Sequence, residues 1–119
     1  MNKLILSLVA FSLLGILAQC KKETTTIDCS GSTPTYLKDV KPILDGNCAS
    51  SGCHAAANPS EGINLSTYAG AKSAGGNTKF IDSIQHNGGA KAMPKGGSKM
   101  SDDKIKLLYC WVQNGMPEN

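Results

Sequence analysis

Residues 48–54 place two cysteines and a histidine in the order Cys48-Ala-Ser-Ser-Gly-Cys53-His54. Two thiols followed at once by an imidazole are what covalent attachment of a haem requires. The thiols add to the two vinyl groups, and the adjacent histidine becomes the proximal ligand of the iron. The usual motif has two residues between the cysteines, whereas this one has four, all small. The segment therefore predicts one covalently bound haem c per chain, attached through a motif that bulges between its thiols.

The N-terminal residues predict export. Lys3 is followed by an apolar run from residue 4 to residue 17, which is short for a membrane span and typical of a signal peptide. The segment Leu17-Ala18-Gln19-Cys20 resembles a bacterial lipobox. This resemblance implies a lipoprotein signal peptide over 1–19, a lipidated Cys20, and a location in the cell envelope, in the periplasm or on the outer membrane. The alternative is an ordinary secretory signal in which Cys20 has no role.

The remaining residues, about 100, suffice for one small domain. We interpret residues 20–33, which are polar and rich in threonine, as a flexible tether to the bilayer, and residues 34–119 as the domain. The net charge of +3 is too mild to suggest a nucleic-acid partner. Aromatic residues are few, so the hydrophobic core is small. A small domain with such a core usually needs a covalent cross-link or a cofactor for stability.

Two further cysteines, Cys29 and Cys110, remain to form a disulfide with each other, because Cys20 is assigned to the lipid and Cys48 and Cys53 to the haem. Disulfides persist in exported proteins, so we expect a bond between Cys29 and Cys110, with two free thiols as the alternative. In the chain-entropy model a loop of this length stabilises a fold by about 4–5 kcal/mol.

The hydrophobic pattern predicts an all-α fold of three to five helices, because no segment alternates with a period of two. The first helix is expected to begin at Thr33-Pro34, to be interrupted at Pro42 and to end at Gly46. Two short helices are expected, one from Ser66 or Thr67 to Lys72 and one over about 79–86. Ser101 is expected to cap the last helix, whose buried stripe is predicted to contain Ile105, Leu108, Tyr109 and Val112.

A second axial ligand is expected if the iron carries electrons. Met93 is the leading candidate, because it lies in an irregular loop and is followed by Pro94, which stiffens the backbone. A thioether ligand favours ferrous iron and raises the reduction potential. His86 and Met100 are the alternatives, and His86 is also open to a solvated role.

Several segments together resemble the small bacterial monohaem c-type cytochromes. These are residues 40–44 with 47–54, residues 62–68, Met93-Pro94, and residues 101–111, so that the resemblance covers about 34–117. It implies a class I-like fold in which the first and last helices cross and the haem edge is exposed. It also implies Cys48 and Cys53 as thioether donors, His54 and Met93 as axial ligands, and single-electron transfer between redox proteins, without enzymatic activity or a small-molecule substrate.

Five lysines surround the expected distal loop, namely Lys91, Lys95, Lys99, Lys104 and Lys106. They form either an ordinary solvated face or a positive collar that steers acidic redox partners.

Two other functions remain open. In one, Met93 does not bind, and a five-coordinate haem acts on peroxide or senses a gas. In the other there is no haem, and Cys48, Cys53, His54 and His86 bind zinc or the thiols act in redox chemistry.

Overall fold

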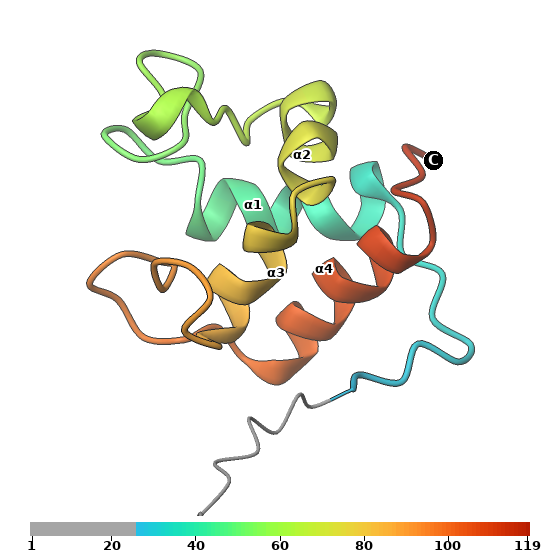
Figure 1. Ribbon diagram of the computed structural model, residues 1–119. Coiled ribbons are helices and arrows are strands. Elements are labelled where there is room, and N and C mark those ends of the chain that lie inside the picture. The colour runs from blue at the N-terminus through green and yellow to red at the C-terminus, as the bar shows by residue number, and fades with distance from the viewer. Residues whose placement is uncertain (1–25) are drawn as a thin grey trace, which may run out of the picture.

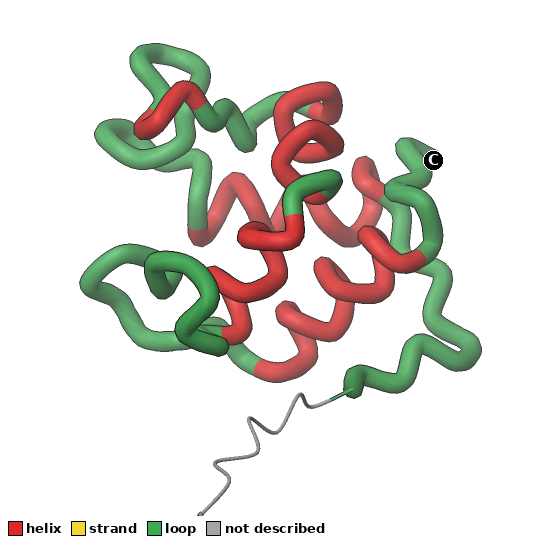
Figure 2. The backbone as a smooth tube through the Cα atoms, viewed as in Figure 1, coloured by secondary structure: helices red, strands yellow, loops and turns green. Residues whose placement is uncertain are grey.

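The structure, a computed structural model, describes residues 26–119, so the predicted signal peptide and Cys20 lie outside the described residues. The longer helices are α1 (Lys41–Asn47), α2 (Tyr68–Gly75), α3 (Thr78–Gln85) and α4 (Asp102–Gln113). A π-helix, η1 (Tyr36–Val40), precedes α1, and a 3-10 turn, η2 (Ser60–Gly62), lies between α1 and α2. The part of the chain shown in colour in Figures 1 and 2 contains no strand, which confirms the all-α prediction for residues 26–119.

The first helical segment changes type at its proline. In η1 the hydrogen bonds span five residues, as in the bond from the Val40 N–H to the Thr35 carbonyl at 3.2 Å. Pro42 has no N–H, and its ring crowds the carbonyl that an α-helix would place four residues earlier, so a wider turn accommodates it. The predicted interruption is thus real. The start is later than predicted, because Thr35 is the N-cap instead of Thr33.

The other helices begin at recognisable caps. The Thr67 hydroxyl accepts a hydrogen bond from the Gly70 N–H at 3.2 Å, and the Asn77 side chain accepts one from the Lys79 N–H at 3.0 Å. Ser101 stands at the N-cap of α4 as predicted, but its side chain makes no capping hydrogen bond. Asp102 and Asp103 lie in the first turn of α4, where negative charge is stabilised by the helix dipole.

The core lies between η1, α1 and α4, with α3 packed against α4 and α2 packed against α3. Trp111 is completely buried, and its ring centre is 6.2 Å from that of Tyr36. The predicted stripe on α4 was wrong here, since it left out Trp111 and included Tyr109 and Val112, which are only half-buried. Trp111 comes three residues after Leu108, so the two share a face of the helix.

The C-terminal tail completes the start of the first helix. The Tyr36 N–H donates to the Pro117 carbonyl at 2.9 Å, and the Leu37 N–H donates to the Glu118 carbonyl at 3.0 Å. These bonds satisfy donors that have no partner inside a helix. The Trp111 Nε1–H also donates to the Pro117 carbonyl, at 2.9 Å, so the same oxygen fixes both the tail and the central side chain.

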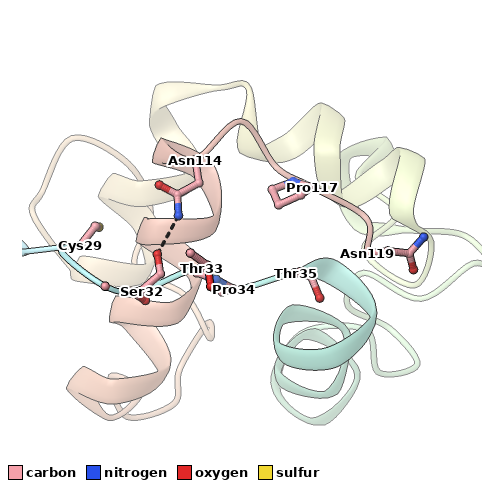
Figure 3. Close-up of a pocket in the computed structure, with 9 residues that line it drawn as sticks. Cys29, Ser32, Thr33, Pro34, Thr35, Asn114, Pro117 and Asn119 are labelled. Carbon is pink, nitrogen blue, oxygen red and sulfur yellow. Dashed lines mark hydrogen bonds between the residues drawn. The ribbon is translucent and has the colours of Figure 1, made fainter.

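The predicted disulfide is present. Cys29 is bonded to Cys110, with their Cα atoms 5.4 Å apart, and the Asn114 amide donates to the Ser32 carbonyl at 2.8 Å (Figure 3). These contacts fasten residues 29–32, which belong to the segment predicted as a tether, along α4. Among residues 26–119, no helix has the length and apolar character needed to span a membrane.

Candidate functional site

The segment of the two cysteines and the histidine folds directly after α1. The N–H groups of Cys48 and Ala49 both donate to the Leu44 carbonyl at 2.8 Å, which ties the first thiol to the last turn of the helix. The His54 N–H donates back to the Cys48 carbonyl at 3.1 Å. The backbones at the two ends of the motif are therefore in contact, although the motif is longer than usual.

The four-residue gap is taken up by a turn. The Cys53 N–H donates to the Ser50 carbonyl at 3.0 Å, and Gly52 adopts a φ of +78°, in the left-handed region that glycine enters without steric cost. The turn displaces Ser50 and Ser51 into solvent, where both are exposed. The four-residue gap, predicted as a bulge, is thus a hydrogen-bonded turn. Across it, the backbones of Cys48 and His54 remain in contact.

The imidazole of His54 is held in one orientation. The side chain is buried, with 9% of its surface exposed, and its Nδ1 lies 2.9 Å from the Ile63 carbonyl oxygen. A carbonyl only accepts hydrogen bonds, so Nδ1 carries the proton and Nε2 keeps its lone pair. The Leu65 N–H donates to the His54 carbonyl at 2.9 Å and holds the backbone as well. Histidines that bind metals are typically oriented in this way.

The sequence did not predict the part played by Ile63. The contribution comes from its backbone carbonyl, which every residue has, so no side-chain pattern could have indicated it. The loop brings this carbonyl under the ring through a hydrogen bond from the Ser60 N–H to the Cys53 carbonyl at 2.6 Å and through the η2 turn. The side chain of Ile63 itself is exposed, one of two large hydrophobic side chains that are exposed among residues 26–119.

The two thiols of the motif are free, and their surroundings differ. Cys48 is half-buried, and burial, followed by the influence of Cys53, raises the pKa of its thiol to about 11. Cys53 is exposed. Since Cys29 and Cys110 are bonded to each other, Cys48 and Cys53 are the unpaired thiols among residues 26–119.

The leading candidate for the second axial ligand lies in the loop between α3 and α4. The Met93 N–H donates to the Ser83 carbonyl at 3.0 Å, and the His86 Nε2 donates to the Met93 carbonyl at 3.0 Å. Met93 is half-buried and precedes Pro94 through a cis peptide bond. This loop and the loop that carries the two thiols extend from the same side of the helical body in Figure 1.

The other candidate ligands are used differently. Met100 is 93% buried, with 7% of its surface exposed, and belongs to the hydrophobic core. His86 directs its Nε2 to the Met93 carbonyl. Within residues 26–119 no three side chains of the types His, Cys, Asp or Glu gather closely enough to hold a metal ion. The zinc alternative, which needs Cys48, Cys53 and both histidines together, therefore has no ligand set in this structure.

A groove of about 560 Å³ lies elsewhere, between the segment that follows Cys29 and the C-terminal tail (Figure 3). It is lined by Cys29, Gly31, Ser32, Thr33, Pro34, Thr35, Asn114, Pro117 and Asn119. The lining contains no Asp, Glu, His, Lys or Arg side chain, and its one cysteine is in the disulfide. The groove therefore offers its Ser and Thr hydroxyls no acidic or basic side chain to activate them, and it contains none of the candidate site residues Cys48, Cys53, His54, His86 and Met93.

Comparison with known proteins adds no assignment: no family model, no curated protein and no solved structure matches the chain. The functional interpretation accordingly depends on the geometry of residues 48–65 and 83–94.

Proposed function

We propose that this chain is a monohaem c-type cytochrome that transfers single electrons between redox proteins at the bacterial cell envelope. The observation that carries the proposal is the state of His54. Its ring is buried, its Nδ1–H is fixed by the Ile63 carbonyl, and its Nε2 keeps a lone pair, in a motif with Cys48 and Cys53, whose thiols are unpaired among residues 26–119. An ordinary core histidine does not need two free thiols beside it, and a zinc site needs three or more ligands close together, which no group of His, Cys, Asp or Glu side chains in residues 26–119 provides.

The residues present fit a haem c. Cys48 and Cys53 would form the two thioether bonds, each by adding its S–H across a vinyl group, and His54 would bind the iron through Nε2. The bound haem supplies a one-electron iron couple. The Ile63 side chain, on the residue whose carbonyl orients the imidazole, is an exposed apolar group that a porphyrin could cover. Met93, the proposed second ligand, stands on a loop that hydrogen bonds hold to α3.

A stain for haem after denaturing electrophoresis tests the proposal, because only a covalently attached haem stays with the unfolded chain. The full chain, exported together with the attachment machinery, should give a stained band that disappears in the double variant Cys48→Ala/Cys53→Ala. A chain that is exported, folded and unstained would overturn the proposal. The rate at which carbon monoxide binds the ferrous protein separates electron transfer from the five-coordinate alternative. Rapid binding requires an open position on the iron and would favour the five-coordinate alternative.

The proposed partners are acidic redox proteins. All five lysines around the Met93 loop are exposed, and of these five only Lys99 has an ion pair with a residue of 26–119, with Asp102 at 3.9 Å. Because opposite charges accelerate encounter, the rate of electron transfer to an acidic partner should fall steeply with ionic strength. Lys91→Glu should slow the reaction at low salt, whereas Lys38→Glu, on η1, is the matched control. A rate that is flat with ionic strength would leave the lysines as a solvated face.

The proposed location follows from the lipobox resemblance at Leu17–Cys20. Lipidation of Cys20 would attach the haem domain to a bilayer of the cell envelope. Labelling with a fatty acid that is lost in Cys20→Ala, with the haem domain intact, is the corresponding measurement.

A further inference from the structure

His86 ends α3 in a conformation that returns the chain to the helix. Its φ is +57° and its ψ is +37°, in the left-handed region, which a few polar residues enter at helix ends. The following segment packs closely on α3, because a Cβ atom added at Gly89 would overlap the carboxylate of Asp82. The chain thus leads back to the last turn of α3, where the Met93 N–H donates to the Ser83 carbonyl at 3.0 Å.

The ring of His86 supplies a second point of attachment for Met93. Its Nε2 lies 3.0 Å from the Met93 carbonyl oxygen. Because that oxygen only accepts, Nε2 carries the proton and donates it. The N–H and the C=O of Met93 are therefore both bonded to the C-terminal end of α3, and the peptide units on either side of the methionine are fixed.

We infer that His86 is a positioning residue, which holds the backbone of Met93 so that the thioether is presented from a fixed point. The inference rests on the proposed function, in which Met93 is the second axial ligand. The bond from His86 Nε2 to the Met93 carbonyl gives His86 a positioning role that does not require it to bind the iron. An axial ligand on an unconstrained loop would dissociate more often, since each dissociation would release more conformational freedom.

Two substitutions at residue 86 separate the ring hydrogen bond from the backbone conformation. In His86→Asn the residue tolerates the left-handed region, but the side chain is too short to reach the Met93 carbonyl. In His86→Gln the longer amide can still donate, while the backbone conformation becomes less favourable. If the hydrogen bond matters, His86→Asn is impaired and His86→Gln is close to the parent chain. If only the backbone matters, the order is reversed and the inference is wrong.

The first measurement needs no haem. Amide hydrogen exchange at Met93 should be faster in His86→Asn by about two- to tenfold, as expected for the loss of one hydrogen bond, and nearly unchanged in His86→Gln. Asn114→Ala is the matched control, because it removes a side-chain bond from the end of α4 to the backbone carbonyl of Ser32 and should leave exchange at Met93 unchanged. Unchanged exchange in His86→Asn would overturn the inference whether or not the chain binds haem.

The second measurement uses the haem-loaded chain. Carbon monoxide binding to the ferrous protein should be faster in His86→Asn by a similar factor, and the ferric absorption band of the iron–thioether bond should weaken, with both restored in His86→Gln. If the chain carries no covalent haem, the proposed function is wrong, and the hydrogen-exchange measurement alone tests whether His86 positions Met93. A thioether band that persists in both variants with unchanged carbon monoxide kinetics defeats the inference alone. A spectrum altered by both His86 substitutions but not by Met93→Ala would make His86 the ligand.

Discussion

Buried polar side chains of this protein are satisfied mainly by backbone carbonyls. His54 donates to the Ile63 carbonyl, Trp111 to the Pro117 carbonyl and Tyr68 to the Met116 carbonyl, each at 2.9 Å. Tyr36 is the exception, because its buried hydroxyl has no hydrogen-bond partner among residues 26–119. A buried donor that lacks a partner costs free energy, whereas a paired donor contributes about 1 kcal/mol.

Two neighbouring tyrosines therefore give opposite predictions. The rings of Tyr36 and Tyr68 are 5.2 Å apart, so both substitutions to phenylalanine occur in the same aromatic cluster. Tyr36→Phe should leave the free energy of unfolding unchanged or raise it slightly, because an unpaired hydroxyl is removed. Tyr68→Phe should lower it by about 1 kcal/mol, because the bond to the Met116 carbonyl is lost. Denaturant unfolding measures both, and a larger loss in Tyr36→Phe would show that its hydroxyl has a partner.

The two thiols of the motif should differ in reactivity in the haem-free chain. The thiolate is the reactive form, and a raised pKa reduces its population at any pH below that pKa. Because the pKa of Cys48 is raised to about 11 and its thiol is half-buried, alkylation at pH 8 should be roughly tenfold or more slower than at Cys53. Mass spectrometry of the labelled peptides gives both rates. The difference should vanish in urea, and equal rates in the folded chain would contradict the burial of Cys48.

At the scale of the helices, the sequence predicted most boundaries and missed those set by tertiary contacts. Thr67 and Ser101 stand at the predicted N-caps, since capping depends on nearby residues. The π-helix before Pro42 was not predicted, because only its interruption is visible from the proline. The central place of Trp111 was also missed, since several faces of α4 carry apolar residues and contact with η1 selects one of them.

In the candidate site, the sequence alone indicated the three motif residues, Cys48, Cys53 and His54. The hydrogen bond to the Ile63 carbonyl and the bond between His86 and Met93 could be found only in the folded chain.

Gly70 in α2 and Gly76 at its C-cap test how closely this helix packs. A Cβ atom on Gly70 would overlap the Asn64 carbonyl oxygen, which lies just before the helix, whereas one on Gly76 would meet no atom closer than 3.5 Å. Gly70→Ala should destabilise the fold by about 2–4 kcal/mol through forced displacement of the backbone. Gly76→Ala should be neutral or stabilise by about 0.5 kcal/mol, since alanine reduces the freedom of the unfolded chain. Thermal or denaturant unfolding compares them, and equal effects would mean that the segment at Asn64 can move.

At the scale of the whole molecule, the small core is reinforced by links between distant parts of the chain. The disulfide joins residues separated by 81 positions, and the C-terminal tail bonds to the first helix. A domain of about 90 residues buries a limited fraction of its surface, so such links form a large share of its stability.

Removal of the disulfide should therefore have a large effect. Cys29→Ala/Cys110→Ala should lower the free energy of unfolding by up to about 4–5 kcal/mol, chiefly because the unfolded chain is no longer cross-linked. Asn114→Ala, which removes only the adjacent bond to the Ser32 carbonyl, should cost about 1 kcal/mol. Chemical unfolding gives both values under oxidising conditions. A double variant as stable as the control variant would show that the link contributes little.

The Pro117 carbonyl, which accepts from both Tyr36 and Trp111, also bears on the order in which the chain can fold during synthesis. The first helix is made early, yet its free donors and its aromatic neighbour find their partners only when residues 111–118 emerge. Until then the nascent chain lacks Trp111, which is completely buried in the folded core. The proposed export would require an extended chain, and the contacts that depend on residues 111–118 would favour such a chain until these residues are present.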